Sequence, residues 1–362
     1  MSGLHETLTG WLSRESRRYL CCAIPPEHVE GATDPGVSLE AGRHYFRLWL
    51  SEMCLRRDRE WFKSWHPAVH SLVRFRFGTQ SVDIPYVAGL QQLPGVEASG
   101  LDRVIQLNYP LTTLMPFNGG VVEINAGLLA LQGADYIARF VKVMGDFAGL
   151  LAAPQLSAAL QVAAPLASGV QELFGASDGR LHLGLHQAYS AAGGDGANEL
   201  RSGYLLAALA DEGQLAPERL WVRAGRLRYG CSQLDGQPLS GHSYMLFRIE
   251  SRTERDDWDS LDFIQKPFQA ALEALGMGER ERAESQIRQA TANALQSPDL
   301  TRTDRRRVAQ AIKDEYDNAR EMGLAASRDA TTTLGQVMRS AMSVDRAAAL
   351  GELRLEDLFA SG

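Results

Sequence analysis

The spacing of apolar residues predicts helices in the first part of the chain. Large apolar residues recur over residues 8–20 at intervals close to one face of a helix. A second helix is predicted from about residue 39 to 62, where Tyr45 and Trp49 lie four residues apart. Proline and glycine residues separate the two patterns. Residues 1–63 are therefore predicted to form an N-terminal helical segment.

The pattern changes to strict alternation after Trp65. From Val73 to Phe77, apolar and charged residues alternate, which is typical of a half-buried strand. Further short apolar runs bounded by turn residues predict strands at 82–87, 104–107, 121–124, 181–185, 204–209, 220–222 and 244–249. Regular helices do not fill the intervals between them, so we expect an antiparallel sandwich or barrel-like domain rather than a parallel doubly wound sheet.

One segment inside this β-rich domain has a helical pattern. Residues 134–174 are predicted to form two helices joined near Pro154, with Pro165 bending or interrupting the second. We therefore expect an apolar helical hairpin inserted between strands of the sheet.

The last part of the chain is predicted to be helical. Patterns with a period near 3.6 cover residues 263–275, 279–295, 304–321 and 334–342. Thr303 is the expected N-cap of the third of these helices, with Asp304 at the positive end of its dipole. The predicted fold class is thus α+β: an N-terminal helical segment 1–63, a β-rich domain 64–262 carrying the hairpin 134–174, and a C-terminal helical domain 263–362.

The composition is typical of a globular protein and argues against one class of partner. The chain has 362 residues, of which 45% are hydrophobic and 22% charged, enough for about two domains with buried cores. Its 37 Lys and Arg against 44 Asp and Glu give a net charge of -7, so we expect no nucleic-acid partner. Four cysteines and the absence of a charged-then-apolar leader pattern predict reduced thiols in a cytoplasmic protein.

The segment from Phe147 to Gln171 carries no charged residue. Its 25 residues would reach across a bilayer, but alanine dominates it, glutamine and serine interrupt it, and Asp146 and Glu172 border it. A buried hairpin packed through small residues is the first interpretation. The functional alternative is a conditionally exposed hairpin that docks on a partner or inserts in a membrane. The apolar candidates for such a surface are Phe147, Leu150, Leu151, Leu156, Leu160, Leu166 and Val170.

Two histidine pairs are weak candidates for a metal site. His182 and His186 lie in a predicted strand, where four residues span about 13 Å, too far for two ligands of one ion. His66 and His70 flank Pro67, and their rings converge only if Pro67 begins a helical turn. We therefore predict no metal and no cofactor.

The known catalytic motifs give little support for an enzyme. Gly175 to Gly179 fits Gly-x-Ser-x-Gly, but the predicted helix precedes it and the strand follows it, the reverse of a nucleophile elbow. Phosphate loops, dinucleotide-binding glycines and His-Glu-x-x-His are missing from the sequence.

Three functional hypotheses follow. The first is a non-enzymatic binding or adaptor protein of a cytoplasmic complex, which uses the hairpin and the terminal helices as surfaces for a protein partner. The second is a membrane-active effector whose uncharged segment is released by a trigger such as proteolysis. The third is a hydrolase or metal enzyme that uses His66 and His70 or His182 and His186. The oligomeric state is not predicted.

Overall fold

The fold is known from a computed structural model, which describes ten stretches of the chain. They are residues 19–31, 35–56, 66–89, 104–131, 142, 155–160, 179–192, 198–211, 213–232 and 234–322. These residues form two compact units. The first, here called the β unit, contains the described residues up to Asp256 together with Pro298–Asp304. The second, the helical unit, contains Asp257–Ser297 and the described residues from Arg305 onward.

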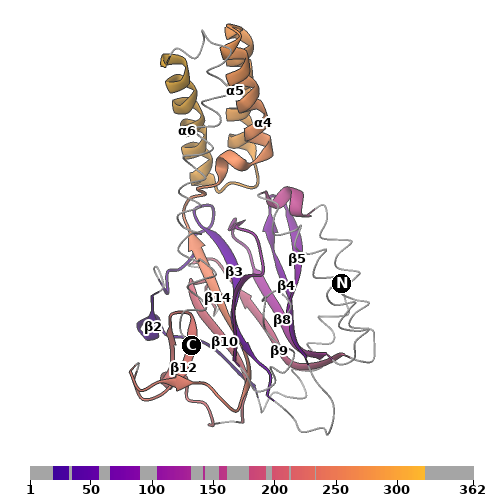
Figure 1. The fold of residues 1–362 in the computed structure, drawn as a ribbon, viewed down its shortest axis with the longest axis vertical. Coiled ribbons are helices and arrows are strands. Elements are labelled where there is room, and N and C mark those ends of the chain that lie inside the picture. Colours follow the sequence, from indigo (N-terminus) through magenta and orange to yellow (C-terminus); the bar gives the residue numbers. More distant parts are fainter. Residues whose placement is uncertain are drawn as a thin grey trace, which may run out of the picture. The chain divides into compact units, whose positions relative to one another are not determined.

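The strands of the β unit form three sheets, which are mostly antiparallel (Figure 1). The central sheet has the order β1–β10–β14–β3–β6, and β7 also pairs with β3. Its strands are β1 Tyr19–Ala23, β3 Tyr45–Cys54, β6 Val104–Pro110, β7 Met115–Pro116, β10 Gly203–Leu209 and β14 Ser243–Arg252.

The other two sheets have four strands each. The lateral sheet, in the order β5–β4–β8–β9, contains β4 His66–Phe77, β5 Gln80–Gly89, β8 Val122–Leu131 and β9 Gly179–Tyr189. The small sheet, in the order β13–β12–β11–β2, contains β2 Val29–Glu30, β11 Leu220–Arg223, β12 Arg226–Tyr229 and β13 Gln237–Pro238. Short 3-10 helices, η2 Pro26–His28 and η4 Pro217–Arg219, lead into β2 and β11.

The two faces of the central sheet belong to two different buried clusters. On β10, Leu205 and Ala207 pack in a cluster shared with the lateral sheet, while Tyr204 and Leu206 pack in a second cluster shared with the small sheet. Successive side chains of a strand point to opposite faces, so a strand covered on both sides has apolar residues at consecutive positions. This is why the β10 and β14 segments are continuous apolar runs rather than alternating ones.

The same cause explains why the predicted helix at residues 39–62 is wrong. Residues 45–54 form the strand β3, in which Phe46, Leu48 and Leu50 are buried in the shared cluster and Tyr45 is buried as well. Burial on both faces removed the alternation and left the four-residue spacing of Tyr45 and Trp49, which imitates a helix. The prediction of an N-terminal helical segment also fails at Tyr19–Ala23, which is β1. Residues 1–18 and 57–65 lie outside the described part of the chain.

The remaining strand predictions and the α+β class are confirmed. Each of the eight strands predicted between residues 73 and 249 overlaps an observed strand. The observed strands are generally longer; β4, for example, begins at His66 and β8 continues to Leu131.

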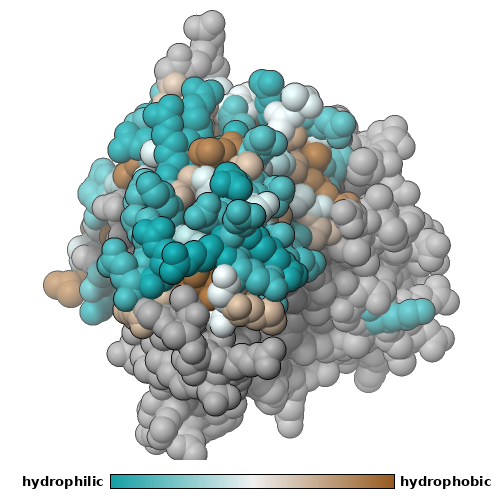
Figure 2. Space-filling view, turned by 90° about the horizontal axis from the view of Figure 1, so that it is seen from above, coloured by the Kyte–Doolittle hydropathy of each residue, from teal (hydrophilic) through white to brown (hydrophobic). Residues whose placement is uncertain are grey.

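The helical unit contains the 3-10 helix η5 Trp258–Ser260 followed by α4 Asp262–Gly276, α5 Arg280–Gln296 and most of α6 Arg302–Glu321. Ile264 of α4, Ile287 of α5 and Ile312 of α6 are buried together with several alanines, whose small side chains allow close packing. In the view of Figure 2, the described surface is mostly hydrophilic and its hydrophobic residues lie in small separate groups. The three helices predicted within residues 263–321 are confirmed, and the one at 334–342 lies outside the described residues.

The N-cap of α6 differs from the prediction. The Asp304 backbone N–H donates to Oγ1 of Thr301 at 3.3 Å, so Thr301 rather than Thr303 accepts from the first turn. The helix begins before the predicted position because Arg302 already belongs to it.

Candidate functional site

The first predicted histidine pair does not converge. His66 and His70 lie on the same continuous strand, β4, so Pro67 begins no helical turn and four residues of strand separate the two by about 13 Å. The His70 ring is 3% exposed, and burial lowers its pKa to about 3. A neutral, buried imidazole fits a structural position in the sheet.

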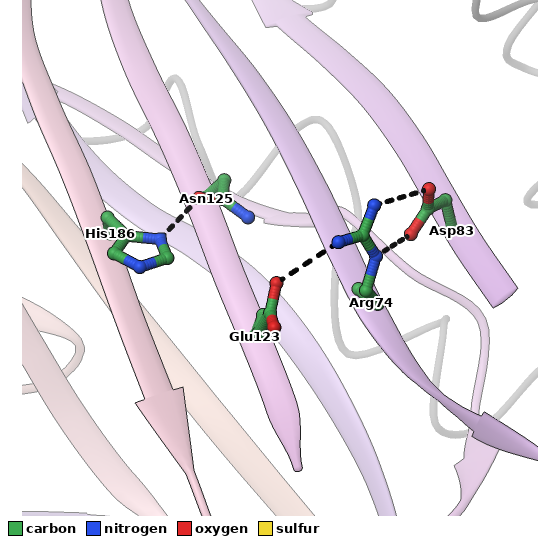
Figure 3. A network of polar contacts seen from close by, with 5 residues as sticks. All are labelled: Arg74, Asp83, Glu123, Asn125 and His186. Atoms are coloured by element: carbon green, nitrogen blue, oxygen red, sulfur yellow. Dashed lines mark hydrogen bonds and ion pairs between the residues drawn. The ribbon is translucent and has the colours of Figure 1, made fainter. Parts of the chain in front are cut away.

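The second pair, His182 and His186, is separated by a bulge. On β9, Leu183 pairs with Leu128 and Leu181 pairs with Leu129, so His182 is the extra residue of the bulge. His182 Nε2 lies 2.8 Å from Ser243 Oγ on the central sheet. His186 instead donates from Nδ1 to Oδ1 of Asn125 on the lateral sheet at 2.7 Å (Figure 3).

The two histidines of β9 thus contact different sheets, His182 the central sheet and His186 a neighbouring strand of the lateral sheet. Within the described ranges, no group of three His, Cys, Asp or Glu side chains is arranged to hold a metal ion.

Near His186, a row of charged residues crosses the lateral sheet (Figure 3). Arg74 of β4 makes two contacts with Asp83 of β5, at 2.7 Å and 3.1 Å, and a third with Glu123 of β8 at 3.5 Å. These three residues are direct neighbours in the strand register. The hydrogen bonds from Asp83 raise the pKa of Arg74, so this guanidinium stays charged. The row links three strands through one guanidinium that contacts two carboxylates.

A buried carboxylate links the central sheet to the small sheet. Glu52 of β3 is 1% exposed; its Oε2 accepts from the Leu227 backbone N–H at 2.7 Å and its Oε1 from the Tyr244 hydroxyl at 3.0 Å. Burial raises the pKa of Glu52, although both hydrogen bonds and the nearby arginines of β12 oppose the shift. Raised carboxyl pKa values occur at catalytic sites. Here, however, both oxygens already accept hydrogen bonds from the fold.

The one described part of the uncharged segment inside the predicted hairpin is a helical turn that belongs to the core. Residues 156–160 are helical, and Leu156 and Ala159 are 1% and 0% exposed within the cluster shared by the central and lateral sheets. The Ser157 backbone N–H donates to Oδ1 of Asp299 at 3.0 Å. Because the first N–H groups of a helix lack partners within it, Asp299 acts there as a cap supplied from a distant part of the chain.

Asp299 is itself held in a buried polar cluster of the β unit. It lies in the segment Pro298–Asp304, where the Tyr45 hydroxyl accepts from the Thr301 N–H at 2.9 Å and donates to Asp304 Oδ2 at 2.8 Å. Asp299, Thr301 and Asp304 are each at most 1% exposed. The segment that fixes the helical turn is therefore anchored to β3 on its other side.

No family model, curated protein or solved structure matches this chain. The functional argument consequently rests on the residues described above.

The predicted partner-binding residues have different outcomes. Leu156 is buried, so it offers no surface in this structure, and Leu160 is partly buried against the same cluster. The other candidates, Phe147, Leu150, Leu151, Leu166 and Val170, lie outside the described residues. Within the described part, no helix combines the length and the apolar run needed to cross a membrane.

Sequence reasoning missed three features of this unit. Glu52 was assigned to a helix, and nothing in a single sequence indicates its hydrogen bonds to the small sheet. Asp299 has no role in the predicted elements, because its partner Ser157 is distant in the sequence. The third, a group of four arginines from Arg219 to Arg228, carried a visible signal because no acidic residue interrupts it.

Proposed function

We propose that this chain is a non-enzymatic, protein-binding regulatory component of a cytoplasmic complex. It holds residues 155–160 of the uncharged segment against its own β unit and exchanges that contact for a protein partner. In this proposal, the central and lateral sheets are the two layers of a β-sandwich whose core receives the segment.

The observation that carries the proposal is the cap on the helical turn. A single side chain, Asp299, accepts the hydrogen bond at the start of residues 156–160, and Leu156 is the large apolar residue of this turn that is fully buried. An N-cap contributes about 1 kcal/mol, so such a contact is weak enough to be exchanged. The segment around it has no charges to keep it in water once it is released.

A second set of contacts favours binding over catalysis. The side chains best suited to acid–base chemistry hold strands together: His182 contacts Ser243, His186 contacts Asn125, and Glu52 accepts from Tyr244. Each of these interactions joins two strands, which is a structural use of the group.

Hydrogen exchange of the full chain tests whether Asp299 holds the segment. Asp299→Ala removes the acceptor, and we expect amide exchange at residues 155–160 to become about tenfold faster, the effect of losing about 1.4 kcal/mol. Asp262→Ala is the matched control, because Asp262 is half-exposed and its carboxylate pairs with Lys266 one turn along α4. Equal exchange in the wild type and Asp299→Ala would overturn the docking.

Binding is then tested with a labelled synthetic peptide of residues 147–171. The peptide competes with the docked turn, and Asp299 would cap either one, so the peptide is tested on Ser157→Pro, which removes only the chain's own donor. We expect the peptide to bind this variant about tenfold more tightly than the wild type. Absence of binding to both proteins would refute partner exchange at this site. If Ser157→Pro instead releases dye from lipid vesicles and does not bind the peptide, the membrane-active alternative replaces the proposal.

A further inference from the structure

The hairpin of β11 and β12 is strongly basic in an acidic protein. Arginines occupy positions 219, 223, 226 and 228, and the ten residues from Arg219 to Arg228 contain no acid, whereas the whole chain has a net charge of -7. Ala224 and Gly225 form the turn between the strands, with φ angles of 48° and 73°. Two successive positive φ angles are typical of the tight turn that joins antiparallel strands.

The strand register places three of these arginines and a tryptophan on one face of the small sheet. Trp221 lies opposite Arg228, and Arg223 lies opposite Arg226. Directly opposite residues point to the same face, as do residues two apart on one strand. The other face carries Leu220, Val222 and Leu227, each 0% exposed. The arginines therefore lie on the outward face, where Arg223 and Arg226 are exposed.

The tryptophan on this face is held rigidly. His28 stacks on the Trp221 ring with centroids 3.7 Å apart, and Trp221 Nε1 donates to the Gly230 carbonyl at 3.3 Å. Tryptophan and arginine are the residue types most enriched among the energetically dominant positions of protein interfaces. A fixed indole beside guanidinium groups can bind with little loss of conformational entropy.

The chain itself shows which ligand chemistry the face accepts. The strand β2 lies parallel to β11, and its Glu30 places Oε2 at 2.8 Å from Arg223 Nε. A strand of polypeptide that carries a carboxylate is thus already bound beside one of the arginines. Further along the face, Arg228 Nε is buried and has no hydrogen-bond partner among the described residues, so it lacks the acceptor that Arg223 has.

We propose that the outward face of the small sheet, formed by Trp221, Arg223, Arg226 and Arg228, binds an extended acidic segment of a partner protein. The partner's carboxylates pair with the guanidinium groups, which form paired hydrogen bonds with carboxylates, and its neighbouring side chains pack on Trp221. The carboxylate of Glu30 on a parallel strand favours a polypeptide ligand over a nucleic acid. Residues 156–160 pack in the cluster of the central and lateral sheets rather than on this surface, and the inference stands without the function proposed above.

The test is a titration of the full chain with a labelled peptide in which glutamate and valine alternate, so that all carboxylates share one face of a strand. At low ionic strength we expect micromolar binding that added salt weakens. The same peptide with glutamine in place of glutamate is expected to bind at least about tenfold more weakly.

The double variant Arg223→Glu/Arg226→Glu changes two exposed residues and is expected to lose the peptide by about a hundredfold. The matched control, Arg282→Glu/Arg288→Glu, makes the same charge change on exposed arginines of α5 and keeps the wild-type affinity. An equal loss in both variants would reduce the effect to net charge and overturn the site. Single-stranded DNA and phosphatidylserine vesicles are tested as alternative ligands. If either binds more tightly than the peptide, and the first variant alone loses this binding, the assignment to a protein partner is refuted.

Discussion

Two tryptophans of the β unit lie directly opposite an arginine on the neighbouring strand, but their surroundings differ in charge. Trp49 of β3 pairs with Arg248 of β14, whose guanidinium lies 4.6 Å from the ring centroid. Glu250, two residues further along β14, accepts from Trp49 Nε1 at 2.7 Å and from Arg252 Nε at 2.6 Å. Glu250 thus pairs with a cation inside this cluster, although Arg248 Nε is buried and has no hydrogen-bond partner among the described residues.

The cluster around Trp221 has the same cross-strand tryptophan–arginine pair but a different balance of positive and negative charges. Trp221 pairs with Arg228, and the opposite pair, Arg223 and Arg226, adds two further positive charges. Glu30, at the border of this face on β2, contacts Arg223, and the charge of Glu52 on β3 also acts on Arg226 and Arg228. We therefore propose that the tryptophan–arginine pair of β3 and β14 is structural, whereas the pair of β11 and β12 belongs to a surface that binds a partner's carboxylates.

Removing the carboxylate of each cluster gives the largest expected difference. Glu250→Gln removes a buried charge that accepts two hydrogen bonds, and we expect the free energy of unfolding to fall by about 2 kcal/mol. Glu30→Gln removes one half-exposed ion pair and should cost less than about 0.5 kcal/mol. Urea denaturation of both variants measures the two changes. Equal losses would remove the distinction between the clusters.

The pH dependence of stability separates the clusters further. Burial alone would raise the pKa of Glu250, but the hydrogen bond and charge of Arg252, helped by Arg47 and Trp49, hold it below 4.5. A carboxyl pKa lowered by folding stabilises above the unfolded value, and this contribution is lost as the pH falls through the folded pKa. The stability gap between the wild type and Glu250→Gln should therefore stay constant down to about pH 5.5 and shrink below pH 4.5.

Protonation of His70 also makes the stability depend on pH, and it does so in both the wild type and Glu250→Gln. His70 has a folded pKa of about 3, below its unfolded value of 6.5, so the neutral ring favours the fold. Its stabilisation is complete above pH 6.5 and is lost as the pH falls towards 3, equally in the wild type and Glu250→Gln. Denaturation curves at several pH values give the difference directly. A gap that stays unchanged at pH 3.5 would contradict the account of Glu250.

The turn that aligns the arginines of β11 and β12 offers a smaller effect. Ala224 has a φ of 48°, a conformation that asparagine and glycine adopt more readily than alanine. Ala224→Asn should raise the free energy of unfolding by about 0.5–1 kcal/mol without changing the affinity for the acidic peptide. Ala224→Val is the control and should lower stability. A destabilised Ala224→Asn would show that the hairpin register is not set by this turn.

The smallest expected effect lies at the border of the Trp49 cluster. Arg252 is 44% exposed and bridges Glu250 and Asp256 at the surface. Arg252→Ala should change the free energy of unfolding by about 0.5 kcal/mol or less, because exposed ion pairs are screened by water. Thermal unfolding at low and high salt measures it. A loss as large as that of Glu250→Gln would mean that Arg252, rather than Glu250, holds the cluster together.

The sequence predicted the end of β4 and the helical unit well because each has one buried face. Val73 to Phe77 alternate and the buried positions of α4 to α6 follow a helical period, so their patterns are unambiguous. The central sheet is buried on both faces, and β3 was consequently mistaken for a helix. The contacts of Asp299 with Ser157 and of Glu52 with Leu227 join residues more than a hundred positions apart, which no local pattern encodes.

The affinity of Glu30→Gln for the acidic peptide tests the central claim most directly. Removing the chain's own carboxylate frees Arg223 for the peptide, so we predict binding about three- to tenfold tighter than in the wild type. A gain in affinity cannot result from misfolding. Unchanged or weaker binding of the peptide to Glu30→Gln would contradict the proposal that this face binds the carboxylates of a partner.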